Sequence, residues 1–339
     1  SRESLNVAQG RATLRHFMRY VNLGNTGLKV SKLCFGTMGF GNAEEWMIEK
    51  DEARKLTDRA INLGINFFDT ANLYSTGRSE EIVGEVLKDY RDDIVLATKL
   101  FFPMGQRPND RGLSRYHIMR EMERSLKRLQ TDHVDLLQTH RWDYETPVEE
   151  TLVALDDLIH AGKIRYIGGS TMYAWQFTKA IYTSRLLGIS EFVSMQDQYN
   201  LCYREEEREV IPLLKDQKIA MLPWSPLARG FLTGKYKRDE KPDSPRYRSD
   251  KPFGPRFFRP EDFDVLDVVE AIAKERGVTP SQIALAWVLN HDFVTSPIVG
   301  VTKMYHLEEA IQAMDIHLSK DEMDRLEKPY KLRAITPPQ

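Results

Sequence analysis

The sequence is poor in cysteine, in long hydrophobic runs and in excess charge of either sign. Its two cysteines, Cys34 and Cys202, exclude a disulfide framework, and neither has a spacing typical of a zinc site. No apolar run approaches the roughly 20 residues that a membrane-spanning helix needs. The 48 basic and 50 acidic residues nearly balance, so nothing favours nucleic acid or an anionic membrane as a partner. We therefore expect a soluble, cytoplasmic protein.

The N-terminal segment differs from the rest of the chain. Residues 1–17 show no clear period, contain Arg2, Arg11 and Arg15, and precede Met18. We expect a tag or a disordered leader there, with a transit peptide as the weaker alternative. Residues 18–339 are expected to form one domain, for which the 41% hydrophobic content of the chain supplies a large core.

Short apolar runs alternate with longer amphipathic ones along this domain, which is typical of parallel strands covered by helices. We expect eight strands, at residues 33–38, 66–71, 94–100, 134–141, 164–170, 193–199, 219–226 and 296–301. Helices are expected between them, among others at residues 51–63, 79–90, 114–130, 147–161 and 205–217. Eight strand–helix cycles predict a (β/α)8 TIM barrel.

Local signals refine this pattern. Thr146 and Thr279 each precede a proline and a Glu or Gln in the capping-box position, which predicts two helix starts. Residues 20–31 alternate around two glycines and predict a β-hairpin that caps the bottom of the barrel. Roughly 70 residues separate strands seven and eight and include the basic, proline-rich stretch 235–259, and such a long insertion is usually functional.

Two familiar classes of site are missing from the sequence. Residues 39–44 (GFGNAE) lack the third glycine and the helix of a doubly wound dinucleotide fold. The eight histidines include no HxH or HExxH pair, which argues against a metallohydrolase, and we expect no metal site.

Polar residues gather where the predicted strands end, which is where barrel enzymes place their chemistry. Asp69, Lys99 and His140 end the second, third and fourth strands, and Tyr74 lies in the loop after Asp69. Each has an ordinary structural interpretation alone, for example Asp69 as a helix cap. Together they form a coherent proton-transfer set.

This set can carry the reduction of a carbonyl by hydride. Hydride transfer leaves negative charge on the carbonyl oxygen, and a positioned donor must neutralise it. Tyr74 would be the general acid, and the Lys99 ammonium, held by Asp69, would favour the ionised phenol. His140 would orient the carbonyl oxygen or help to relay the proton.

The segments that contain these residues resemble the aldo-keto reductase superfamily. They are residues 66–74 (NFFDTANLY), 97–99 (ATK) and 137–140 (LQTH). Two further segments, 164–170 (IRYIGGS) and 224–230 (WSPLARG), are similar to family segments in the same order, and the likeness extends from Tyr20 to about Leu326. The chain most resembles the branch of aryl-alcohol dehydrogenases and versiconal hemiacetal acetate reductases, with potassium-channel β subunits as more distant relatives.

The resemblance implies NADPH or NADP+ bound across the barrel mouth. It places Trp224 on the nicotinamide, Ser170 and Gln196 at the carboxamide, and Lys303 at the 2′-phosphate, while Thr171 stands where many relatives have Asn. The full set that it implies for the cofactor is Gly36, Thr37, Met38, Ser170, Thr171, Gln196, Trp224, Ser225, Pro226, Leu227, Ala228, Arg229, Gly230, Lys235, Arg248, Gly300, Thr302, Lys303, His306 and Glu309.

The sequence narrows the substrate only in part. Aromatic residues in segments that could wall the pocket favour an aromatic or other apolar carbonyl; they are Phe40, Trp46, Phe101, Phe102, Trp142 and Tyr199. Arg141 and the basic loop leave an anionic or phosphorylated carbonyl open. A Schiff-base aldolase using Lys99 and a non-catalytic NADPH-sensing subunit also stay open, and no oligomer is indicated.

Overall fold

Eight parallel strands form the centre of the fold. The computed structural model describes residues 18–238, 248 and 259–335. Its strands run in the order β10, β3, β4, β5, β6, β7, β8, β9, and every neighbouring pair is parallel. Their bounds are β3 (Cys34–Gly36), β4 (Phe67–Asp69), β5 (Val95–Leu100), β6 (Val134–Thr139), β7 (Ile164–Ser170), β8 (Phe192–Gln198), β9 (Ala220–Trp224) and β10 (Ile298–Gly300).

The two edges of this sheet meet, which nearly closes the barrel. Met221 of β9 forms a parallel bridge with Val294, and the Thr295 amide donates a hydrogen bond to the Met221 carbonyl at 2.9 Å. The carboxyl ends of all eight strands therefore surround one opening. The predicted (β/α)8 fold is confirmed.

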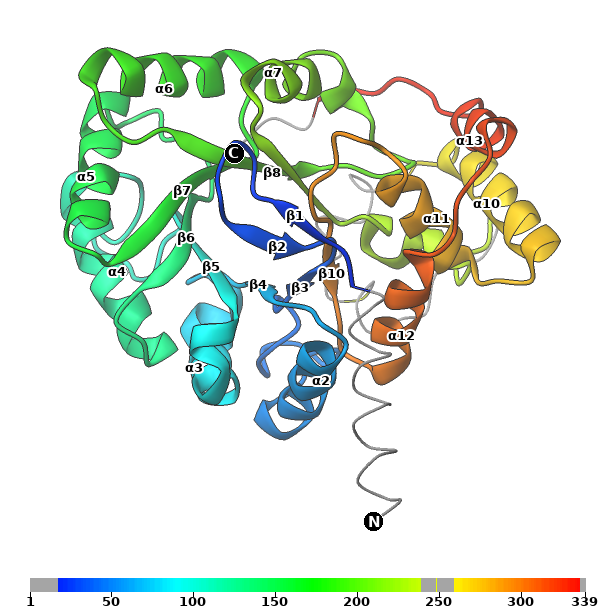
Figure 1. The fold of residues 1–339 in the computed structure, drawn as a ribbon, viewed down its shortest axis with the longest axis horizontal. Helices are drawn as coiled ribbons and strands as arrows, with labels where there is room; N and C mark the ends of the chain where they lie inside the picture. The colour runs from blue at the N-terminus through cyan, green and yellow to red at the C-terminus, as the bar shows by residue number, and fades with distance from the viewer. Residues whose placement is uncertain (1–17, 239–247, 249–258, 336–339) are drawn as a thin grey trace.

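Helices surround the barrel (Figure 1). They are α2 (Lys50–Asn62), α3 (Arg78–Leu87), α4 (Arg115–Leu129), α5 (Val148–His160), α6 (Ala174–Leu187), α7 (Val210–Gln217), α10 (Asp262–Arg276), α11 (Pro280–Leu289), α12 (Met304–Ala313) and α13 (Lys320–Glu327). Their apolar faces and the outward side chains of the strands form one large cluster of buried residues, while a second cluster fills the barrel interior. The helices thus bury the outer surface of the sheet and leave the barrel ends for loops.

Both predicted helix starts are confirmed to within a residue, but only one of them has the predicted capping box. Thr279 and Gln282 form the capping box that begins α11, with Thr279 Oγ1 accepting from the Gln282 amide at 3.3 Å. At α5 the Thr146 hydroxyl instead donates to Asp143 Oδ2 at 2.7 Å, and the helix begins at Val148 without a side-chain cap. A nearby carboxylate has therefore engaged the hydroxyl that the capping pattern assigned to the backbone.

The predicted hairpin is confirmed at the end of the barrel where the strands begin. Strands β1 (Tyr20–Asn22) and β2 (Lys29–Ser31) pair antiparallel and lie across the barrel in Figure 1. Leu23 and Val30 are fully buried in the interior cluster. Gly24 has φ +58°, and a Cβ there would lie 2.6 Å from the Val193 carbonyl oxygen. The hairpin therefore closes the barrel floor by close contact.

The strands are mostly shorter than the sequence suggested. Strand β4 ends at Asp69 rather than at residue 71, because the chain then turns toward the 3₁₀ helix η1 (Tyr74–Gly77). The long interval between β9 and β10 contains the 3₁₀ helix η4 (Ala228–Thr233), α10 and α11. Most of the predicted basic stretch, at residues 239–247 and 249–258, lies outside the described residues, as do residues 1–17.

The C-terminal segment packs against the loop that follows β8. Tyr330 Oη donates to Glu205 Oε1 at 2.7 Å and accepts from the Arg204 amide at 3.0 Å. Arg333 donates to the Cys202 carbonyl at 2.9 Å, and its amide donates to Glu205 Oε1 at 2.8 Å. These contacts fix the loop from the outside.

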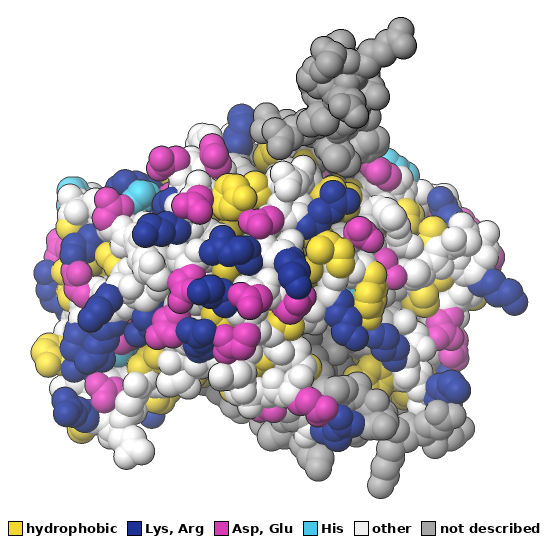
Figure 2. Space-filling model, turned by 90° about the horizontal axis from the view of Figure 1, so that it is seen from below, with side chains coloured by type: hydrophobic (Ala, Val, Ile, Leu, Met, Phe, Trp, Pro, Cys, Tyr) yellow, Lys and Arg dark blue, Asp and Glu magenta, His cyan; other side chains and the backbone are white. Residues whose placement is uncertain are grey.

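The surface carries both signs of charge. On the face that Figure 2 shows, Lys and Arg side chains are interspersed with Asp and Glu. Within the described part of the chain, no helix combines the length and the apolarity needed to cross a bilayer.

Candidate active site

Asp69, Lys99 and Tyr74 meet at the carboxyl ends of β4 and β5. Lys99 Nζ donates to Asp69 Oδ1 at 2.5 Å, to the Thr70 carbonyl at 2.8 Å and to Tyr74 Oη at 3.0 Å. These three bonds use all three ammonium hydrogens. We expected Asp69, Lys99 and Tyr74 to lie close together from the sequence, and in the structure they are in contact.

Lys99 is completely buried, with 0% exposure. Burial by itself would lower the pKa of the ammonium, but the charges of Asp69 and Tyr74 and the hydrogen bonds to them outweigh it and raise the pKa of Lys99. The lysine therefore stays charged at neutral pH, although it has no contact with water. Its charge is directed at the phenol oxygen of Tyr74.

Two glutamines hold Asp69 from the side opposite the lysine. Gln138 Nε2 and Gln196 Nε2 each donate to Asp69 Oδ2 at 2.9 Å, and Gln196 Nε2 also donates to Gln138 Oε1 at 3.0 Å. Sequence reasoning missed Gln138. Its spacing of two residues from His140, which puts both on one face of the strand, was the available signal.

His140 lies beside Tyr74 and is mostly buried. Its ring is 6.1 Å from the Tyr74 ring and 4.9 Å from the Phe102 ring between centroids, edge-on to both. Burial, with the positive charges of Lys99 and Arg141, holds the pKa of His140 well below its usual value. Its Nδ1 is buried and has no hydrogen-bond partner among the described residues. The ring is therefore a neutral imidazole at neutral pH, with one N–H to donate.

The turn that carries Tyr74 has an unusual backbone. Ser75, Thr76 and Gly77 follow it with φ of 47°, 51° and 94°, all in the left-handed region. The Ser75 hydroxyl donates to the Phe40 carbonyl at 3.2 Å, and a Cβ on Gly41 would lie 2.2 Å from Ser75 Oγ. Backbone strain of this kind is common at functional sites and persists only where the surroundings impose it. Here the chain around Gly41 imposes it.

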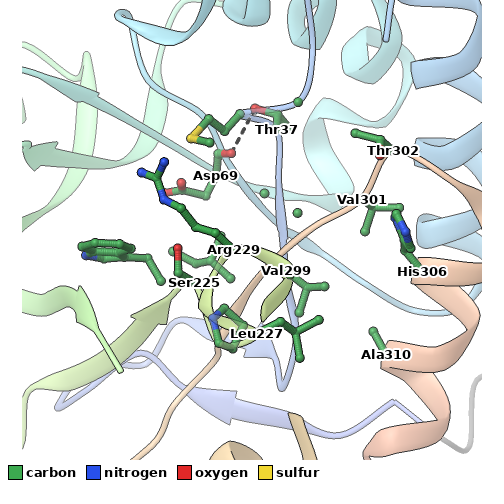
Figure 3. Close-up of a pocket in the computed structure, with 18 of the residues that line it drawn as sticks. Thr37, Asp69, Ser225, Leu227, Arg229, Val299, Val301, Thr302, His306 and Ala310 are labelled. Carbon is green, nitrogen blue, oxygen red and sulfur yellow. Dashed lines mark hydrogen bonds between the residues drawn. The ribbon is translucent and has the colours of Figure 1, made fainter. Parts of the chain in front are cut away.

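A cavity of about 1050 Å³ opens above these residues. Asp69, Tyr74 and His140 line it, together with most of the residues expected to contact a cofactor. Those are Gly36, Thr37, Met38, Ser170, Thr171, Gln196, Trp224, Ser225, Pro226, Leu227, Arg229, Gly230, Lys235, Gly300, Thr302, Lys303, His306 and Glu309. In Figure 3, Thr37 and Asp69 lie on one side of this space, Ser225, Leu227 and Arg229 on another, and Thr302, His306 and Ala310 on a third.

Two expected cofactor residues do not line the cavity. Ala228 is buried in the core. Arg248 pairs with Glu45 at 3.1 Å, and Glu45 is the member of that pair that lines the cavity.

Four aromatic residues expected at the pocket wall also lie elsewhere. Phe40 is fully buried against Phe35, and Phe101 packs against the core. Trp142 lines a separate, much smaller cavity and contacts Trp175. Tyr199, which the sequence also suggested, stacks on the buried Trp287. Trp46 and Phe102 do line the main cavity. Phe101 and Phe102 are adjacent in the sequence, yet only Phe102 faces this cavity.

The loop after β9 has the strongest backbone irregularity next to the cavity. Ser225, Ala228 and Arg229 have φ of 51°, 47° and 54°, and none of them is glycine. Thr171, which directly follows β7, has φ 50°, and its hydroxyl accepts from Trp224 Nε1 at 3.2 Å. The Thr171 hydroxyl therefore holds the indole ring of Trp224 in place. Asn200, which sequence reasoning missed, donates to the Ser225 carbonyl at 3.0 Å.

The opposite wall presents a helix N-terminus. Lys303 is the N-cap residue of α12, its side chain is exposed, and it lines the cavity beside Thr302. Unpaired amides and the helix dipole at such an end favour an anion. Within the described residues no group of three or more His, Cys, Asp or Glu side chains is placed to hold a metal ion.

Comparisons with known proteins agree with this geometry. The sequence model described as "Aldo/keto reductase family" matches residues 32–331. Versiconal hemiacetal acetate reductase of Aspergillus parasiticus is 39% identical over 345 residues, which cover 94% of this chain and 99% of that protein. AAD16 of Saccharomyces cerevisiae, provisionally named an aryl-alcohol dehydrogenase, is 38% identical over 340 residues, 93% of this chain and 97% of that protein.

A third relative has a name of another kind. A protein of Oryza sativa subsp. japonica, named as a probable voltage-gated potassium channel subunit beta, is 38% identical over 319 residues. The alignment covers 91% of this chain and 96% of that protein.

Proposed function

The chain belongs to the aldo/keto reductase family, and from that premise we propose that it reduces aldehydes and ketones to alcohols with NADPH. Trp46 and Phe102 provide an apolar wall for the body of the substrate, which favours carbonyl compounds with an aromatic or other apolar body. The observation that carries the proposal is the contact between the Tyr74 hydroxyl and the buried Lys99 ammonium at the cavity. We propose that residues 18–339 act as one domain that binds both cofactor and substrate.

The cavity suits an extended dinucleotide. Its volume of about 1050 Å³ exceeds what a small carbonyl compound needs. Trp224, held by Thr171, offers a flat face for a nicotinamide. Lys303 at the start of α12 offers a cation and backbone amides for the 2′-phosphate that distinguishes NADPH from NADH. Arg229 and Lys235 supply positive charge for the pyrophosphate.

The bound dinucleotide would supply the hydride, and the side chains of this chain would handle the proton. Tyr74 gives its hydroxyl proton to the carbonyl oxygen as negative charge develops there. Lys99 stabilises the phenolate that remains, because its ammonium is 3.0 Å from the phenol oxygen and cannot be solvated by water. Asp69 keeps that ammonium charged and oriented. Neutral His140 donates its N–H to the carbonyl oxygen and orients it.

The geometry is unfavourable for a Schiff-base aldolase. A nucleophilic lysine needs a neutral amine with access to the substrate. Lys99 is fully buried, its pKa is raised, and all three of its hydrogens are engaged. The remaining alternative, a cofactor-sensing subunit, would bind NADPH and turn over no substrate.

A panel of aldehydes and ketones, assayed for NADPH oxidation by absorbance, tests the proposal. Tyr74→Phe should lower kcat roughly 100- to 10,000-fold, the range for losing a general acid, and should bind NADPH normally. Tyr90→Phe is the matched control, because its hydroxyl contacts Asp58 on the outer helices. Parental activity in Tyr74→Phe would refute the assigned acid. NADPH binding without oxidation by any carbonyl would favour the sensing subunit.

A further inference from the structure

Arg141 occupies a distinctive position beside the proposed reaction centre. It follows His140 directly, lines the main cavity and donates from Nη1 to the His140 carbonyl at 2.6 Å. Its guanidinium lies 5.3 Å from the centroid of the Phe102 ring, which in turn contacts the His140 ring. The cation is thus fixed next to the group that would orient the carbonyl oxygen.

Within the described part of the chain, Arg141 has no ion-pair partner. Among the described residues, no carboxylate oxygen lies within 4.0 Å of its nitrogens. Arg91, Arg128 and Arg204, which are also partly buried, each pair with a carboxylate, at 2.9, 2.7 and 2.8 Å. Burying a guanidinium without a counter-ion costs free energy. An arginine that is left without one at the wall of a cavity therefore needs a reason.

The charged groups around Arg141 act on it in opposite directions, and none of the described carboxylates forms a salt bridge with it. Burial lowers the pKa of Arg141, and the like charge of Arg229 adds to that effect, although the group stays protonated. The acidic group that acts on it most is Asp197, which also lines the cavity. Burial and the neighbouring Glu206 raise the pKa of Asp197 well above its usual value, while the charge of Arg141 opposes that rise.

We propose that Arg141 binds an anionic group on the substrate, so that the preferred carbonyl compound carries a carboxylate or a phosphate. This inference rests on the proposed reductase function and narrows its substrate class. The guanidinium fork matches the two oxygens of either anion. Trp46 and Phe102 pack against the body of the substrate, while Arg141 holds its charged end and His140 its carbonyl oxygen.

Matched pairs of carbonyl compounds test this inference. The pairs are para-formylbenzoate and its methyl ester, succinic semialdehyde and butanal, and glyceraldehyde phosphate and glyceraldehyde. We expect the anionic member of at least one pair to have a kcat/KM about 10-fold higher, and the preferred pair separates carboxylate from phosphate recognition. This preference should fall as ionic strength rises, because salt screens the attraction. Equal kcat/KM values within all three pairs would overturn the proposal.

Variants of Arg141 test whether this residue causes the preference for anionic substrates. In Arg141→Met, the ratio of kcat/KM for the anionic and neutral members should fall roughly 10- to 100-fold. Arg141→Lys keeps the charge without the fork and should show an intermediate loss. Arg165→Met is the matched control, since Arg165 is exposed near the start of β7, donates to the Gly162 carbonyl and does not line the main cavity as described. Its ratio should equal that of the parent.

Two further outcomes are distinguishable. If Arg141→Met weakens NADPH binding and leaves the substrate ratio unchanged, the arginine serves the cofactor and the inference is wrong. If the parent protein oxidises NADPH with none of the six carbonyl compounds, the proposed reductase function is wrong instead. The first result overturns the anion subsite alone, and the second removes the premise on which it stands.

Discussion

Replacing Asp69 with Asn tests whether the Lys99 ammonium depends on one buried carboxylate. Asp69 accepts from Lys99 at 2.5 Å and from Gln138 and Gln196 at 2.9 Å each. Asn offers one oxygen for these donors, so its amide nitrogen must face either the ammonium or the two glutamine N–H groups. Removing one partner of a buried ion pair costs about 3–5 kcal/mol, and we expect a loss of unfolding free energy in that range.

The Lys99→Met variant and the double variant separate the ion pair from other effects. Lys99→Met leaves a buried carboxylate that still accepts from two amides, so it should also destabilise the fold. The double variant has no buried charge at this place. Its loss of unfolding free energy should therefore be about 2–3 kcal/mol smaller than the sum of the single losses. Urea unfolding, followed by tryptophan fluorescence and circular dichroism, measures all four proteins.

The dependence on pH gives a second readout with a definite sign. In the parent the pKa of Lys99 is raised, so its contribution to stability is complete below the unfolded value of about 10.4 and is lost only above it. In Asp69→Asn, burial without the counter-ion should lower that pKa below the unfolded value. Stability of the variant should then rise between about pH 7 and pH 9.5, by at most about 1.4 kcal/mol per pH unit. Additive single effects together with equal pH slopes would refute the reasoning.

Two other outcomes follow from the site. The folded state holds the pKa of His140 well below its usual value, so stability is complete above about pH 6.5 and falls as acid protonates the unfolded chain. From about pH 7.5 to pH 5 this loss should reach about 2 kcal/mol, and urea midpoints should show a smaller loss in His140→Phe; an unchanged acid slope would exclude this source. Lys303→Ala should raise the Kd of NADPH about 10-fold and that of NADH little, by fluorescence titration, with Lys29→Ala on the barrel floor as control. Equal weakening of both dinucleotides would remove Lys303 from the 2′-phosphate.

Much of the fold could be predicted because it depends on local signals. The period of apolar runs placed all eight strands, and strand order then follows from the right-handed β–α–β connection. Asp69, Lys99 and His140 could be grouped because they end neighbouring strands, and parallel strands end at the same side of a barrel. The family resemblance added most of the residues that line the main cavity on the side of β9, β10 and α12.

The features that the sequence did not predict depend on which way a side chain points and on which of several partners takes a hydrogen bond. Phe101 and Phe102 are adjacent and both aromatic, yet only Phe102 lines the main cavity, and composition does not reveal which one turns inward. Thr146 fits a capping pattern, but a carboxylate three residues earlier binds its hydroxyl. That no described carboxylate pairs with Arg141 is likewise a three-dimensional fact, since Asp143 and Glu145 lie within four residues of it in the sequence.

The attachment of the C-terminal segment has a practical consequence for protein engineering. Tyr330 and Arg333 fasten the loop after β8, and Tyr203 and Glu206 of that loop form part of the cavity wall. A truncation that removes Tyr330 and Arg333 should therefore weaken the affinity for substrate or cofactor more than it lowers the stability of the barrel. Affinity tags and fluorescent proteins are better fused ahead of the β1–β2 hairpin. The hairpin lies at the floor of the barrel, away from the cavity and from the loop after β8.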